Sequence, residues 1–63
     1  MVVQVQTETL LTSRQVAHWL GISASTLCRM RQEGRGPQVV WLSGSTPRYR
    51  REDVADWLER QTS

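Results

Sequence analysis

The sequence has no lysine, a single cysteine and no long apolar run. Cys28 alone cannot form an internal disulfide, and His18 lies ten residues away on another segment, so we expect no metal and no other cofactor. No apolar stretch approaches the roughly 18 residues of a membrane span. The N-terminus also lacks the basic start and apolar middle of a signal peptide. We therefore expect a cytoplasmic protein that does not contact a membrane.

The short length excludes most enzyme architectures. A chain of 63 residues forms one domain at most, and a domain of this size buries only about 60% of the surface that its unfolded chain exposes. Little room remains for an enclosed active site, and no cluster of nucleophile, base and acid stands out. We predict that the protein is not an enzyme and has no catalytic residues.

Positive charge is concentrated in the middle of the chain. Residues 14–51 carry seven of the eight arginines and one acid, Glu33, whereas residues 52–63 carry four acids and one arginine. Guanidinium groups bind phosphates and base edges with two hydrogen bonds at once, which an ammonium group cannot do. The pattern fits a nucleic-acid-binding surface and equally fits a solvated basic surface.

Two short helices joined by a tight turn are predicted next. Thr12 and Gln15 have the spacing of a capping box, and Gly21 follows the last apolar residue of this first helix. Ser23 is a second cap, for a helix expected over residues 24–33. This is the sequence outline of a helix-turn-helix.

After the second helix the residues no longer follow helical spacing, and the pattern predicts a β-hairpin. Residues 34–37 form a turn, residues 39–42 favour a strand, residues 43–47 make a flexible tip and residues 48–50 alternate as a returning strand. If both neighbours of Trp41 point inward, Trp41 points outward.

A third helix is predicted from the acidic pair Glu52 and Asp53, which the helix dipole favours at an N-terminus. Its apolar positions recur at helical spacing and dock it on the core: Val54, Trp57 and Leu58. We assign Trp57 and Trp19 to the core. We expect Tyr49 to pack between hairpin and core, with its hydroxyl reaching solvent or a phosphate.

These elements predict one α+β domain, a small winged helix-turn-helix with two short helices, a β-hairpin wing and a C-terminal helix. We expect a flexible N-terminus over residues 1–9, where valine alternates with polar residues, with an edge strand as the alternative. The winged domain covers residues 10–63.

The second helix is poor in apolar residues. Leu27 and Met30 fall within about 60° of one another around its axis. The far side gathers polar side chains, with Cys28 at its margin: Ser25, Arg29 and Gln32. Small hydroxyls permit close approach, while arginine and glutamine can read guanine and adenine in the major groove. An ordinary exposed face is the alternative, but a helix-turn-helix followed by a hairpin favours DNA binding.

Five motifs occur in a fixed order along residues 10–60: Leu10-Leu11-Thr12, Ala17-x-x-Leu20-Gly21-Ile22-Ser23, Ser25-Thr26-Leu27, Gly34-Arg35-Gly36-Pro37 and Arg48-Tyr49-Arg50-Arg51-Glu52-Asp53-Val54-x-x-Trp57-Leu58. Their order and spacing resemble the excisionase family of winged helix-turn-helix proteins, which is related to the MerR-type DNA-binding domain. The resemblance implies a small, non-catalytic DNA-binding protein of a phage or integrative element. Many members are recombination directionality factors that bend attachment-site DNA and help an integrase excise the element; others regulate transcription.

The resemblance also implies which residues meet DNA. The family's recognition helix matches residues 23–33, and its wing matches residues 39–50 and enters the adjacent minor groove. On the recognition helix the base-contacting positions match Ser25 and Arg29, and Thr26 and Cys28 fall near the DNA backbone. Ser23 and Gln32 complete the contacts expected from this helix. On the wing and its flanks the expected contacts are Arg14, Arg35, Ser45, Arg48 and Arg50.

Three features depart from the family pattern. Trp41 stands where the outward wing position is often basic, and the tip over residues 43–47 has no basic residue beside its glycine. Arg31 stands where many relatives have an apolar residue. Arg48 and Arg50 are the residues that could compensate for the weaker wing.

The partners implied are double-stranded DNA, an integrase (a tyrosine or serine recombinase) and neighbouring copies bound cooperatively along DNA, with a monomer in solution. The setting is a bacterial host cell, with nucleoid association when bound. One alternative is a small MerR-like transcriptional regulator of a mobile element, although the chain ends five residues after Leu58, where a MerR-type activator has a long dimerisation helix. A second is a protein–protein adaptor, which predicts salt-insensitive binding.

Overall fold

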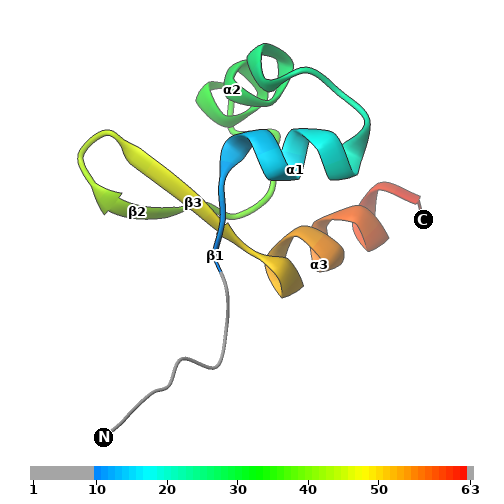
Figure 1. The fold of residues 1–63 in the computed structure, drawn as a ribbon. Coiled ribbons are helices and arrows are strands. Elements are labelled where there is room, and N and C mark those ends of the chain that lie inside the picture. The colour runs from blue at the N-terminus through cyan, green and yellow to red at the C-terminus, as the bar shows by residue number, and fades with distance from the viewer. Residues whose placement is uncertain (1–9, 63) are drawn as a thin grey trace, which may run out of the picture.

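The computed structural model describes residues 10–62, so the flexible N-terminus predicted over residues 1–9 lies outside the described residues. The chain forms three helices and three short strands (Figure 1). In order, they are β1 (Leu10–Leu11), α1 (Ser13–Leu20), α2 (Ala24–Gln32), β2 (Val40–Ser43), β3 (Thr46–Arg50) and α3 (Arg51–Thr62). This is the predicted α+β winged helix-turn-helix architecture.

Local hydrogen bonds fix both ends of α1. The backbone N–H of Gln15 donates to Thr12 Oγ1 at 3.1 Å, and the backbone N–H of Thr12 donates to Gln15 Oε1 at 2.9 Å. The capping box is therefore confirmed. Gly21 ends the helix with a φ of +73°, in the left-handed region where a residue with a Cβ is strained.

Helix α2, like α1, is capped at its start by a side-chain hydroxyl. Ser23 Oγ accepts a hydrogen bond from the backbone N–H of Thr26 at 3.0 Å, which confirms the cap. The helix ends at Gln32, one residue before the predicted end, because Glu33 is its C-cap and Gly34 turns the chain with a φ of +72°.

The strands form one antiparallel sheet in the order β1-β3-β2. Leu11 pairs with Tyr49, and Val40 pairs with Arg48. The short strand β1 was not part of the predicted hairpin. The predicted tip over residues 43–47 is too long: Ser43 pairs with Thr46, so the loop shrinks to two residues, and Pro47 lies within β3.

The core lies where α1, α2, β3 and α3 meet (Figure 1). Its buried side chains are Leu11, Val16, Ala17, Leu27, Tyr49 and Val54. Half-buried apolar side chains surround it: Leu20, Ile22, Val39 and Leu58. Val54 and Leu58 thus dock α3 as predicted.

The assignment of two tryptophans to the core is wrong. Trp19 is 41% exposed, because the buried side of the eight-residue α1 is already occupied by Val16 and Ala17. Trp57 is half-buried outside the core cluster, and its Nε1–H donates to the backbone oxygen of Arg35 at 3.1 Å. Both indoles lie at the margin of the core.

The outer end of the hairpin extends away from the helices (Figure 1), and residues 41–45 are exposed. Trp41 is 51% exposed, as its outward orientation predicted. Leu42, which lies on the inward side if Trp41 points outward, is nevertheless 56% exposed. The reason is that no helix covers the outer half of the hairpin.

Candidate nucleic-acid interface

The polar face of α2 is exposed opposite the buried Leu27. Ser25, Arg29 and Gln32 all lie on this exposed side. Within residues 10–62, the side chains of Ser25 and Arg29 form no hydrogen bond or ion pair. Their donors and acceptors are therefore available to a ligand.

Two other predicted residues of the helix are already engaged. Ser23 Oγ donates to Thr26 Oγ1 at 2.9 Å while it accepts the backbone N–H of Thr26. The two hydroxyls form the N-cap of α2, and Thr26 is half-buried. These hydrogen bonds fix the first turn of α2, in which Ser25 lies.

Cys28 lies at the margin of the polar face, half-buried, as the helical spacing predicts. Its Sγ accepts hydrogen bonds from Gln32 Nε2 at 3.7 Å and from Arg31 Nη2 at 3.4 Å. The thiol is thus a shared acceptor for the side chains of Arg31 and Gln32.

The flanking arginines differ in how strongly they are neutralised. Arg14 is exposed on α1. Arg35 is also exposed, but its Nη2 lies 2.6 Å from Glu33 Oε1, and its Nε also donates to that oxygen. Because both side chains face solvent, the pair is weakly held and screened. Arg35 can therefore exchange this carboxylate for a phosphate.

On the hairpin, the predicted contacts lie on β3 and at the tip. Arg48 is half-buried, and its Nη1 donates to the backbone oxygen of Pro47 at 2.8 Å. Arg50 is half-buried and lies 3.9 Å from an oxygen of Asp53. Ser45 is exposed in the two-residue tip. The hairpin therefore carries two cationic side chains along one strand and a small polar tip.

Arg31 is the residue whose role the sequence did not reveal. Its Nη1 donates to Tyr49 Oη at 3.1 Å and to Ser13 Oγ at 3.3 Å. The guanidinium carbon also lies 5.7 Å from the centroid of the Trp41 ring. Tyr49 is fully buried, so the expectation that its hydroxyl reaches solvent or a phosphate is wrong: the hydroxyl meets Arg31 instead.

One signal could have found this contact. Arg31 follows Leu27 by four residues, which places both on nearly the same side of α2. A charged residue at such a position must find polar partners inside the fold.

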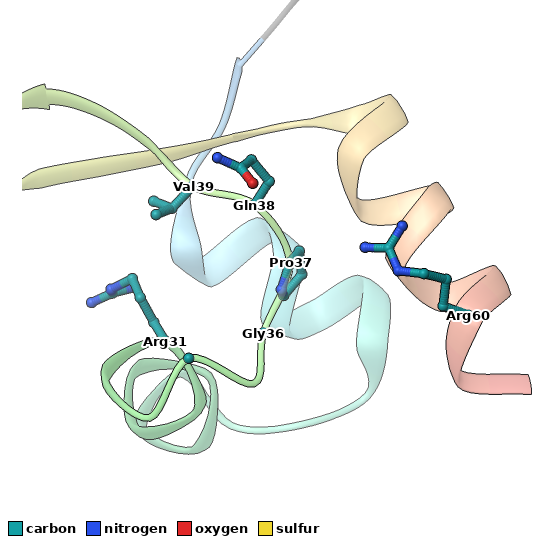
Figure 2. A pocket seen from close by; sticks show the side chains of 7 residues that line it. Arg31, Gly36, Pro37, Gln38, Val39 and Arg60 are labelled. Carbon is teal, nitrogen blue, oxygen red and sulfur yellow. The ribbon is translucent and has the colours of Figure 1, made fainter.

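An open pocket lies between the end of α2, the following loop and α3 (Figure 2). Its lining residues are Arg31, Gly34, Gly36, Pro37, Gln38, Val39 and Arg60. Figure 2 shows Arg31 extending toward Val39 and away from Arg60. Across residues 10–62, no group of three His, Cys, Asp or Glu side chains could hold a metal. No described helix is long and apolar enough to cross a membrane.

A family model described as a helix-turn-helix domain matches residues 10–62. The chain belongs to this family. The helix-turn-helix domain family includes excisionase-like DNA-binding proteins, and its members are typically not enzymes. No curated protein matches the chain. Membership of the helix-turn-helix domain family thus indicates that the protein binds DNA.

Proposed function

We propose that the protein is a sequence-specific excisionase, a recombination directionality factor that binds and bends attachment-site DNA and assists an integrase. The observation that carries the proposal is the display of Ser25 and Arg29 on a capped helix, where their side chains are unpaired within the described residues. A hairpin whose outer end is exposed follows this helix. A winged helix-turn-helix uses such a helix in the major groove.

In this proposal α2 reads the base sequence. Arg29 donates two hydrogen bonds to a guanine, and Ser25 allows the helix to approach the base edges closely. Gln32 lies on the same exposed face, one turn later, and offers an amide for an adenine. Ser23 and Thr26, whose side chains cap the start of α2, place this end of the helix near a phosphate.

The remaining cations position the domain on the phosphate backbone. Arg14 and Arg35 flank the helix, and Arg48 and Arg50 line the wing. Phosphate contacts of this kind set register and orientation without reading sequence. Ser45 in the tip enters the adjacent minor groove, where a small side chain fits the narrow floor.

The partners follow from the proposed role. An integrase of the tyrosine or serine recombinase class acts on the DNA that this protein bends. Neighbouring copies occupy adjacent sites side by side, so that several small bends add up to a larger one.

An excision assay tests the proposal directly. A supercoiled plasmid carrying the attachment sites is incubated with a tyrosine or serine recombinase that acts on those sites, with and without the protein. Excision should depend on the protein and should fall with Arg29→Ala. Arg51→Ala is the matched control, because Arg51 is another exposed arginine and lies outside the proposed interface. Excision that proceeds equally without the protein would contradict the proposal, and regulation of transcription or an adaptor role would replace it.

A further inference from the structure

The side chain of Arg31 joins four elements of the fold. It begins on α2 and contacts Ser13 at the start of α1, Tyr49 on β3 and the Trp41 ring on β2. Its second terminal nitrogen donates to Cys28 Sγ, one turn back along its own helix. Arg31 therefore connects the helix-turn-helix unit to both strands of the hairpin.

No carboxylate takes part in this contact. Within residues 10–62, Arg31 forms no ion pair, and its acceptors are two hydroxyls, a thiol and an aromatic face. A planar guanidinium presents five N–H donors in a fixed fork, so that it can bond several acceptors in defined directions. The contact is therefore directional, and an ammonium group could not reproduce it.

The hairpin has few other attachments to α2. Trp41 and Leu42 are exposed, and β2 supplies no member of the buried core. The fully buried Tyr49 anchors β3 in the core and meets Arg31 through its hydroxyl. In Figure 2 the Arg31 side chain extends from α2 toward the base of the hairpin. The base of the hairpin is also paired with β1, at Leu11 and Tyr49, so the Arg31–Tyr49 contact is the direct side-chain link between the hairpin and α2.

We propose that Arg31 is a positioning residue that holds the wing at a fixed orientation to α2. The orientation sets the spacing between the contact that α2 makes in the major groove and the contact that the wing makes in the minor groove. This consequence for binding rests on the proposed DNA-binding function, whereas the orientation itself is a property of the free protein.

Three variants separate geometry from charge. Arg31→Met keeps the length of the stem and removes every donor, and Arg31→Lys keeps the charge but loses the fork. Tyr49→Phe keeps the buried ring and removes only the hydroxyl to which Arg31 donates. The matched control is Arg29→Met, the same substitution two residues earlier on the exposed face. Circular dichroism first establishes that each variant is folded; should Arg31→Met not fold, the two conservative variants carry the test.

Residual dipolar couplings of backbone amides in the free protein measure the orientation. For the wild type and Arg29→Met, the couplings of α2 and the hairpin should fit one rigid body. In Arg31→Met, Arg31→Lys and Tyr49→Phe, the hairpin couplings should depart from that fit while those of α1 and α2 keep it. Couplings that fit the wild-type arrangement in all three variants would overturn the proposal.

Hydroxyl-radical footprinting on the specific duplex measures the consequence for binding. We expect Arg31→Lys and Tyr49→Phe to lose the protection next to the wing, to keep the protection next to α2, and to bind about tenfold more weakly. Arg29→Met should lose protection next to α2 instead. If Arg31→Lys binds like the wild type, Arg31 acts through its charge alone and the proposal is overturned. A wild-type protein that gives no footprint contradicts the DNA-binding function, and the dipolar couplings then still decide whether Arg31 positions the wing.

Discussion

The helix-turn-helix unit and the wing are held in place by different kinds of contact. The ends of α1 and α2 are fixed by hydrogen bonds between residues three apart, at Thr12–Gln15 and Ser23–Thr26. The wing is joined to the rest by contacts between residues far apart in sequence, such as Arg31 with Tyr49, 18 positions later. The start of α2 is therefore fixed by its own sequence, whereas the orientation of the wing depends on the whole fold.

Removing the anchor of the wing should have the largest effect. Tyr49→Ala deletes a fully buried aromatic ring and should lower the free energy of unfolding by about 3–5 kcal/mol. A small domain has a total stability of about 5–15 kcal/mol, so the variant should lose a large fraction of its stability. Urea denaturation followed by circular dichroism measures the change.

The control for this prediction is the other large aromatic of the hairpin. Trp41→Ala removes a side chain that is 51% exposed and should cost no more than about 1 kcal/mol, most of it from the lost contact with Arg31. Equal losses for Tyr49→Ala and Trp41→Ala would show that the hairpin is not anchored through Tyr49.

The second prediction compares how the two regions meet DNA. Arg29→Ala should lose about 1–3 kcal/mol of binding free energy on the specific duplex and discrimination at one base pair. Arg48→Ala should weaken binding to every sequence and reduce the salt slope by about one contact. Fluorescence anisotropy on specific and scrambled duplexes separates the two. If Arg29→Ala weakens both duplexes equally, Arg29 binds a phosphate and the recognition face is misassigned.

The third prediction compares two turns at which added side chains meet open space. Nothing lies within 4 Å of a Cβ built on Gly21 or on Gly44. Gly21, between the helices, has a φ of +73°, whereas Gly44, at the tip of the hairpin, has no positive φ. Gly21→Ala should therefore cost about 1–2 kcal/mol through backbone strain, and Gly44→Ala less than about 0.5 kcal/mol. A thermal denaturation series measures both, and equal melting temperatures would mean that the turn between α1 and α2 tolerates a side chain.

The contrast between contacts of neighbouring residues and contacts of distant residues also explains what could be predicted from the sequence. Thr12, Gln15, Ser23 and Gly21 act on their own neighbours, so the caps and the turn could be located without knowing the fold. The exposed placement of Arg29 followed from helical spacing alone, and its role at a base remains a prediction.

The features that could not be predicted from the sequence depend on contacts between residues far apart in the chain. Trp19 lies on the apolar side of α1, but how far that side is covered is decided by α2 and β3, so its exposure could not be read locally. Arg31 looked like a departure from a family pattern because its partners, Ser13 and Tyr49, are 18 residues away in either direction. Alternation places Leu42 on the opposite face of the strand from Trp41, but it does not show whether anything covers that face.

The central claim is that α2 and the arginines around it bind DNA, and the salt dependence of binding tests it most directly. The dissociation constant for a duplex carrying the attachment site is measured between about 50 and 200 mM salt, where displaced counterions dominate the response. The claim predicts a straight line of log affinity against log salt, with a slope of about −0.9 for each phosphate contacted. Affinity that stays unchanged over this range would contradict the claim.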